Sequence, residues 1–140
     1  VYRLRLMLES IAVEKACDLR PEDAIPKVKT LFAAMKASIY KPKIFMRRNT
    51  QFHFSIYSYA DSPILLEILN RLWARVGPYV YTYAIMTQDS SKVLKRHQRM
   101  LEGLEKRDKK KITDALREDL EAAARVIIPA LEKSTPRHAP

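Results

Sequence analysis

Apolar residues recur three and four positions apart in long stretches of this chain, and that spacing is typical of amphipathic helices. The clearest stripe consists of Ile112, Ala115, Leu116, Leu120, Ala123 and Ile127. Only two of the 140 residues are glycines, which argues against a β-sandwich or barrel with its many turns. We therefore predict an all-α domain.

Prolines and capping residues divide the chain into about six predicted helices, and the short connections favour an antiparallel bundle. The predicted ranges are 1–19, 22–38, 42–59, 63 to at least 76, 91–106 and 108–131. Gly77-Pro78 should kink or break the fourth helix. Residues 79–86 alternate as in a strand but are assigned as helix. We expect residues 1–134 to form one domain and residues 135–140 a frayed tail.

Regular apolar stripes also occur on the first and the fourth predicted helices. On the first helix, the residues that share one side are Leu4, Leu8, Ile11 and Ala12. On the fourth helix, the residues that we expect to face inward are Ile64, Leu65, Ile68, Leu69, Leu72, Trp73 and Val76. An apolar stripe of this kind normally packs against the core of the domain.

Four polar residues interrupt such stripes. His97 stands among Val93, Met100, Leu101 and Leu104. Asn49 and His53 interrupt the stripe of Phe45, Phe52, Ile56 and Ala60, and Asp119 interrupts the stripe of the last helix. A buried polar group without a partner costs about 1–3 kcal/mol. Two imidazoles, an amide oxygen and a carboxylate that meet in a core would suit a divalent metal ion.

Asn49 and His53 are four positions apart, so a helix places both side chains on one face, within reach of one ion. A single histidine on an apolar face is more often a core residue satisfied by a backbone or carboxylate partner. The coincidence with His97 and Asp119 on two further helices favours the metal. We expect zinc, with nickel or manganese as alternatives. A metal-free site, in which the four side chains hydrogen-bond to each other, is a further alternative.

Two arginines beside apolar stripes are candidates for binding an organic acid, because a guanidinium can clamp a carboxylate through two parallel hydrogen bonds. Arg5 adjoins Leu4, and a salt bridge with Glu9 explains its position equally well. Arg75 follows Trp73, where a salt bridge or a solvent-exposed position is the favoured explanation.

The formal net charge of +10 raises the question of nucleic-acid binding. The densest basic run consists of Lys106, Arg107, Lys109, Lys110 and Lys111. No aromatic residue interleaves with this run, so a platform for stacking bases is unsupported. A solvated basic surface is the favoured interpretation.

Cys17 is the only cysteine, and we expect it to pack between helices in a reducing, cytoplasmic environment. No stretch approaches the roughly 18 uninterrupted apolar residues of a membrane span, so we expect no membrane partner. The first residue is Val1 and not methionine, and we therefore expect the chain to be part of a longer protein. His138 lies in the predicted tail and is expected to be exposed.

Five short motifs occur in order over essentially the whole chain. They are Arg5-Leu6-Met7-Leu8-Glu9, Asn49-Thr50-Gln51-Phe52-His53, Ala60-Asp61-Ser62-Pro63-Ile64-Leu65, Arg96-His97-Gln98-Arg99-Met100-Leu101 and the stretch 108–120. Together they resemble the FCD domain, the C-terminal effector domain of the FadR subfamily of GntR-type bacterial transcription regulators.

The resemblance implies a helical bundle of the shorter, VanR-like type that binds an effector and mediates dimerisation. It also implies a metal site, for which the family uses one Asp and three His. Carried over residue by residue, these positions are Asn49, His53, His97 and Asp119. Two positions match, and the carboxylate has in effect moved from the third helix to the sixth. A winged helix-turn-helix normally precedes this domain in the family and is absent from the chain.

Three functions follow from these observations. The first is a ligand-sensing and dimerisation module of a transcription regulator, in which a small carboxylate binds over the metal with contacts from Arg5, Arg75 and Tyr83. The second is a metal-dependent helical-bundle enzyme, although the chain has neither a di-iron nor a zinc-protease motif. The third is a basic bundle that binds nucleic acid directly. We predict the first, a homodimeric domain that is not an enzyme and reaches DNA only through the missing domain.

Overall fold

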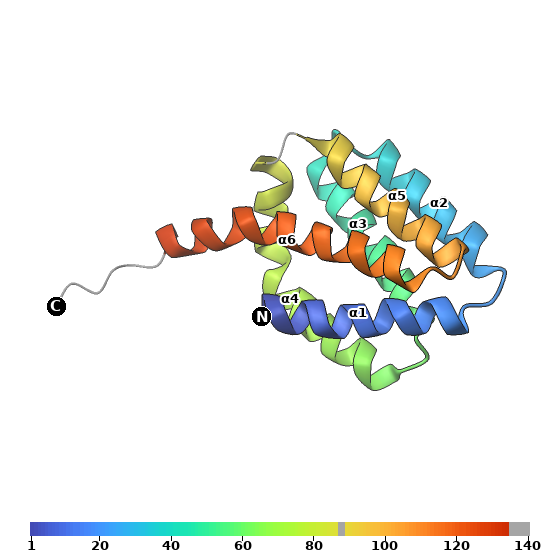
Figure 1. Ribbon diagram of the computed structural model, residues 1–140. Helices are drawn as coiled ribbons and strands as arrows, with labels where there is room; N and C mark the ends of the chain where they lie inside the picture. Colours follow the sequence, from blue (N-terminus) through green and yellow to red (C-terminus); the bar gives the residue numbers. More distant parts are fainter. Residues whose placement is uncertain (87–88, 135–140) are drawn as a thin grey trace.

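The predicted all-α bundle is confirmed. The computed structural model describes residues 1–86 and 89–134, without side-chain detail for residues 81, 83–86 and 134. Within this part the chain forms six helices and no strand (Figure 1): α1 (Tyr2–Leu19), α2 (Ala24–Ala37), α3 (Pro42–Ser58), α4 (Pro63–Met86), α5 (Ser90–Glu105) and α6 (Lys109–Ser134). None of the described helices combines the length and the apolar character that crossing a membrane requires.

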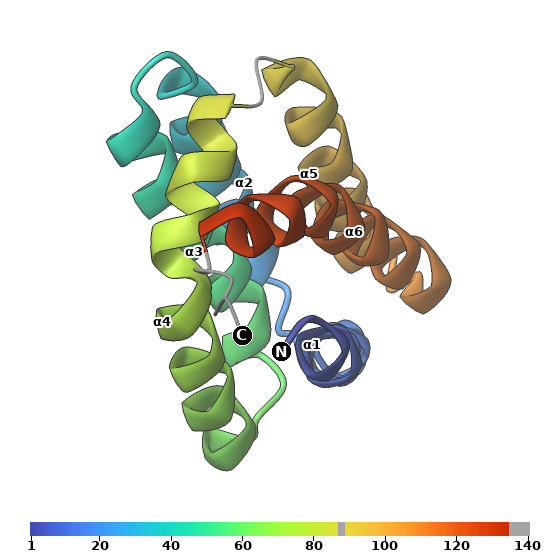
Figure 2. The same ribbon diagram turned by 90° about the vertical axis from the view of Figure 1, so that its left-hand side faces the viewer.

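Helix α6 occupies a central position in the bundle. It packs along α5 and α1 and also contacts α4, while α2 and α3 pair with each other (Figures 1 and 2). The two helices α5 and α6 run in opposite directions and are joined by a short turn. One face each of α3, α5 and α6 therefore borders the same interior space, and these are the faces on which polar residues interrupt the apolar stripes.

The α5–α6 turn brings two helix backbones unusually close together. Arg107 adopts a positive φ of 52°, and the amide of Asp108 donates to the carbonyl of Gly103 at 2.8 Å, which closes the turn. A Cβ atom on Gly103 would lie only 2.8 Å from the backbone nitrogen of Ile112 and 2.9 Å from its Cβ. Glycine is therefore required at this crossing.

Two arginines tie the ends of α1 and α5 to each other. Arg20, which follows α1, donates to the carbonyls of Leu104 and Glu105 at the end of α5, at 2.8 and 2.7 Å. Arg107, which follows α5, donates in return to the carbonyl of Cys17 at 2.6 Å and to that of Arg20 at 3.0 Å. These contacts satisfy carbonyl groups that a helix end leaves without intrahelical partners.

Cys17 is fully buried between these helices, as predicted, and burial raises the pKa of its thiol to about 11. A thiol with such a pKa carries almost no thiolate at neutral pH and is correspondingly unreactive.

The predicted side of α1 is only partly buried. Ala12 is fully buried and Leu8 packs against the core. Leu4 and Ile11, however, are 46% and 47% exposed, whereas Arg5 and Glu9 lie on the buried face. The apolar residues of α1 itself are distributed around its whole circumference, so their spacing alone does not select one face. The buried face is the one whose two charges can pair with each other, through Arg5 Nε and Glu9 Oε1 at 2.8 Å.

Helix α4 differs from the prediction in two respects. The prediction was a kink or a break at Gly77-Pro78, and the break does not occur, because one helix continues through Pro78 to Met86. Gly77 makes this possible, because it has no Cβ to clash with the proline ring in a helical conformation. Its apolar stripe is also narrower than expected: Leu69 and Trp73 are buried, but Ile64 and Ile68 are 74% and 39% exposed.

We predict that Gly103→Ala lowers the free energy of unfolding by about 1–3 kcal/mol, because its methyl group would force α5 and α6 apart. The control is Gly77→Ala. Apart from its chain neighbours and the backbone of its own helix, no atom lies within 4 Å of a Cβ built there. The cost of this substitution is therefore limited to the local clash with Pro78, which the gain in helix propensity opposes. Urea denaturation of both variants checks this. Equal midpoints for Gly103→Ala and wild type would contradict the close crossing.

Candidate metal centre

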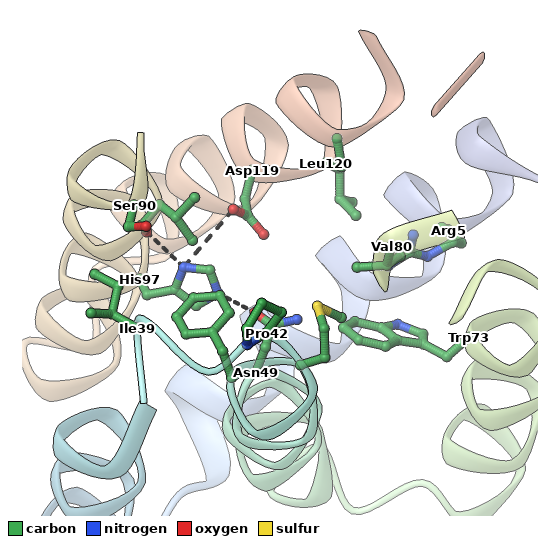
Figure 3. Close-up of a pocket in the computed structure, with 14 residues that line it drawn as sticks. Arg5, Ile39, Pro42, Asn49, Trp73, Val80, Ser90, His97, Asp119 and Leu120 are labelled. Carbon is green, nitrogen blue, oxygen red and sulfur yellow. Dashed lines mark hydrogen bonds and ion pairs between the residues drawn. The ribbon is translucent and has the colours of Figure 1, made fainter. Parts of the chain in front are cut away.

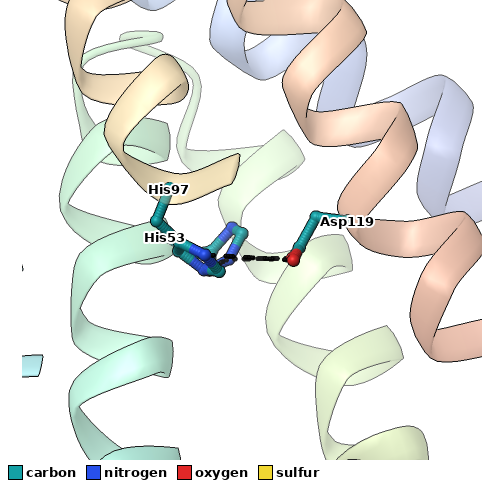
Figure 4. A group of neighbouring side chains, drawn as sticks. All are labelled: His53, His97 and Asp119. Atoms are coloured by element: carbon teal, nitrogen blue, oxygen red, sulfur yellow. Dashed lines mark hydrogen bonds and ion pairs between the residues drawn. The ribbon is translucent and has the colours of Figure 1, made fainter. Parts of the chain in front are cut away.

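The four predicted polar residues do meet in the core. Nε2 of His97 on α5 lies 2.8 Å from Oδ1 of Asn49 and 2.9 Å from Nε2 of His53, both on α3. Oδ2 of Asp119 on α6 lies 3.6 Å from Nε2 of His53. The candidate ligand atoms of His53, His97 and Asp119 are all within 4.8 Å of one another (Figure 4). Three helices thus contribute to one cluster.

The orientation of His97 is fixed by its own helix. Its Nδ1 lies 2.8 Å from the carbonyl oxygen of Val93, one turn earlier on α5. A carbonyl can only accept, so Nδ1 carries the proton and Nε2 carries a lone pair. Burial lowers the pKa of His97 to about 4, and the imidazole is therefore neutral at physiological pH. A neutral imidazole with a free Nε2 lone pair is the form that binds metals.

The orientation of His53 is fixed by neighbouring side chains. Its Nδ1 lies 3.1 Å from the hydroxyl oxygen of Tyr57, one turn further along α3. Tyr57 donates its own proton to Oε2 of Glu9 on α1. Burial and the adjacent Glu9 raise the pKa of Tyr57, so the phenol keeps that proton. The oxygen of Tyr57 therefore accepts from Nδ1 of His53, so the neutral form of His53 has its lone pair on Nε2 as well.

When both imidazoles are neutral, the two histidines present Nε2 lone pairs to each other beside an amide oxygen. In that form no proton lies between the nitrogens of His53 and His97, which are 2.9 Å apart. A cation that binds both Nε2 atoms would remove the repulsion between their lone pairs. Imidazole nitrogens together with carboxylate and amide oxygens suit a borderline divalent ion such as zinc. The donor set therefore fits the metal that the sequence predicts.

Asp119 supplies the negative charge of the cluster. Burial alone would raise the pKa of its carboxyl group, but the facing imidazoles of His97 and His53 and the guanidinium of Arg96 outweigh burial and hold the pKa well below its usual range. Arg96 donates from Nε to Oδ1 of Asp119 at 3.1 Å. Asp119 is therefore an oriented carboxylate at neutral pH, with its second oxygen directed at His53.

A small cavity of about 60 Å³ opens directly beside this cluster (Figure 3). His97, Asn49 and Asp119 line one part of it, and Arg5 and Trp73 line another. The remaining wall is mostly apolar and consists of Ile39, Pro42, Phe45, Met46, Val80, Val93, Leu120 and Ala123, with Ser90 at one side. Such a volume holds roughly four water molecules, or a carboxylate group with a short carbon chain.

The three predicted effector-binding residues have different positions. Arg5 lines the cavity and forms the salt bridge with Glu9, so both interpretations of this residue are compatible with its geometry. Arg75 is exposed on α4 and does not line the cavity. Tyr83 belongs to α4, but its side chain lies outside the described part, as does His138 entirely.

Sequence reasoning missed Glu9 and Tyr57 as members of the site. Both are almost completely buried, and they connect α1 to His53. A signal was present, because Tyr57 lies one turn after His53, on the same side of α3, and Glu9 lies one turn after Arg5 on α1. Their meeting depends on how α1 packs against α3, which helical spacing does not predict.

Comparison with known proteins gives consistent results. Among curated proteins, the HTH-type transcriptional regulator McbR of Escherichia coli (strain K12) is 29% identical over 113 residues. That match covers 77% of this chain and 49% of McbR, so the chain spans about half the length of this relative. Among solved structures, E. coli McbR/YncC matches with a TM-score of 0.82 and 22% identity, covering 91% of this chain and 66% of that one.

The likeness to the solved structure confirms the all-helical fold. A family model described as the FCD domain matches residues 1–122, which is most of the chain. The resemblance stated from five short motifs is therefore confirmed. This chain belongs to the FCD domain family.

Proposed function

We propose that this chain is the metal-dependent, ligand-sensing domain of a transcription regulator. The observation that carries the proposal is the pair of Nε2 nitrogens of His53 and His97, which face each other at 2.9 Å beside a cavity lined by an arginine. His53, His97 and Asp119 would hold the metal, with Asn49 as a neutral oxygen ligand. Zinc is the first choice, with nickel or manganese as alternatives.

The proposed effector is a small carboxylate. A bound divalent ion supplies positive charge at one end of the cavity, and the guanidinium of Arg5 supplies it at another. An arginine has five N–H donors. Arg5 donates to Glu9 from Nε, and in our proposal its terminal nitrogens donate to the acid. The apolar wall between the two positive ends would accommodate a short carbon chain. An organic anion of a few carbons therefore fits the charge and the volume of the cavity.

The proposed regulatory role draws on the curated relative, whose name describes a transcriptional regulator with a helix-turn-helix. In our proposal the whole protein acts as a cytoplasmic homodimer and contacts DNA through a winged helix-turn-helix outside this chain. Effector binding would favour one of two arrangements of the dimer and so change DNA binding, which requires different affinities for the two arrangements.

The two competing functions have less support. The curated relative is named a transcriptional regulator, which supports a regulatory role over an enzymatic one. For direct nucleic-acid binding, the basic run would have to be available to phosphates. Within the described residues, however, Lys109 pairs with Asp18 at 2.7 Å and Lys111 with Glu102 at 2.7 Å. These pairs favour the solvated basic surface that the sequence predicted.

The metal assignment predicts that the purified domain retains about one zinc per chain. His53→Ala and His97→Ala should each lose most of it, because each removes a buried nitrogen ligand. Elemental analysis after gel filtration measures this. His138→Ala is the matched control, since it also removes an imidazole but none of the four residues of the cluster. Equal metal content in all four proteins would refute the ligand assignment.

The effector assignment predicts a rise in Tm with some members of a panel of mono-, di- and tricarboxylates of up to about six carbons, and only with zinc present. Arg5→Lys keeps the charge but loses the planar fork of donors, and should weaken the affinity for those acids at least about tenfold. Arg75→Lys, on the exposed face of α4, should leave the shift unchanged. An equal loss in both variants would count against Arg5 as the anchor.

Helices α1 and α4 offer a surface for dimerisation. Met7 on α1 is 65% exposed, and Leu4 and Ile11 extend the same apolar side of that helix. Ile64 and Ile68 add a second exposed stripe on α4, which packs against α1. Exposed apolar stripes on adjacent helices mark an interaction surface, and in our proposal a second copy of the chain covers it.

We expect Met7→Glu combined with Ile64→Glu to weaken the homodimer at least about tenfold, because a carboxylate buried in an apolar interface is costly. Sedimentation velocity over a range of concentrations measures the monomer–dimer equilibrium. Ile44→Glu is the control, as it places the same charge on an exposed isoleucine of α3. A double variant that remains as dimeric as wild type would place the interface elsewhere.

A further inference from the structure

Glu9 is the meeting point of three hydrogen-bond donors from three helices. Its carboxylate is fully buried. Oε1 accepts from Nε of Arg5 at 2.8 Å and from Nε1 of Trp73 on α4 at 3.0 Å. Oε2 accepts from the hydroxyl of Tyr57 on α3. The guanidinium of Arg5 also stacks over the Trp73 ring, 4.7 Å from its centroid.

The direction of these bonds is fixed from Glu9 outward. A carboxylate offers only acceptors, so Tyr57 must donate to it. The tyrosine oxygen is then left with acceptor capacity only, and Nδ1 of His53 lies 3.1 Å away. This nitrogen therefore carries a proton. The negative charge on Glu9 thereby leaves the lone pair of the neutral imidazole on Nε2, the nitrogen that faces the metal centre.

His53 and His97 differ in which partner fixes the proton on Nδ1. His97 is held by a backbone carbonyl of its own helix, which persists for as long as α5 does. His53 is held by a chain of side chains that ends on α1. A network that served stability alone would need only to satisfy its polar atoms. This one ends on the ring nitrogen opposite the proposed ligand atom, and partners in that position set ligand orientation and basicity in metal sites.

We propose that Glu9 and Tyr57 are positioning residues that hold His53 as its Nδ1–H tautomer, and so link the metal centre to Arg5 on α1. The link to metal binding rests on the proposed function. The tautomer of His53 does not, because it can be measured in metal-free protein.

This relay gives a physical route between the acid and the metal. Arg5 contacts both the cavity and Glu9. An acid that draws the guanidinium towards itself leaves more of the negative charge of Glu9 for Tyr57, and this strengthens the bond that Tyr57 accepts from His53. The acid and the metal should therefore raise each other's affinity by the same factor, as linkage requires. Removal of Tyr57's hydroxyl should reduce that factor towards one.

The test is Tyr57→Phe, which deletes the hydroxyl and keeps the aromatic ring. Long-range ¹H–¹⁵N NMR of metal-free protein at pH 8 reports the tautomer of each histidine. We expect wild-type His53 to be protonated on Nδ1 and the variant to shift towards Nε2–H, while His97 does not change. Zinc affinity, measured by competition with a chromophoric chelator, should fall about 10–100-fold. Tyr59→Phe, two residues further along, is the matched control and should change neither quantity.

An unchanged His53 tautomer in Tyr57→Phe would overturn the proposal, and so would an equal change at His97, which would indicate general loosening of the site. If wild type binds no zinc, the proposed metal centre fails, but the tautomer measurement still decides the positioning role.

If Tyr57→Phe does not fold, Glu9→Gln replaces it. An amide is a weaker acceptor than a carboxylate, so we expect the same shift at His53 with a smaller amplitude, and no shift would again contradict the relay.

Discussion

The contact between Nε2 of His53 and Nε2 of His97 is the interaction on which the organisation of this domain depends. It joins α3 to α5 in the core, where the two nitrogens face each other at 2.9 Å. When both rings are neutral, neither nitrogen offers the other a donor, and this arrangement is costly in a core unless it serves a reason other than stability. A metal ion that accepts both lone pairs supplies that reason, and it would also bind α3, α5 and α6 together.

The charge of the site follows from neighbours of these two imidazoles. Asp119 brings one negative charge, and Arg96 both orients and balances it. The FCD resemblance implies an aspartate at position 49 and a histidine at position 119, and this chain has the reverse distribution of charge. Because Asn49 contacts His97 and Asp119 faces His53, the carboxylate still faces the same centre, from α6 instead of α3.

The sequence predicted the convergence of Asn49, His53, His97 and Asp119 because the helical period fixes the face on which each residue lies. It did not predict which helices would become neighbours. The relay from Glu9 through Tyr57 depends on the packing of α1 against α3 and was missed for this reason. Leu4 and Ile11 were wrongly placed on the inner face of α1, because leucines and isoleucines outweigh Arg5 and Glu9 in any apolar pattern. In the folded chain the two charges are buried together, with hydrogen bonds to Tyr57 and Trp73.

The most direct test of the central claim is an anomalous difference map from crystals of the zinc-loaded domain, recorded at the zinc edge. The account predicts one strong peak in the core, about 2.0–2.1 Å from Nε2 of both His53 and His97. A map with peaks only at surface side chains, or a core peak bound through Nδ1 of either histidine, would contradict it.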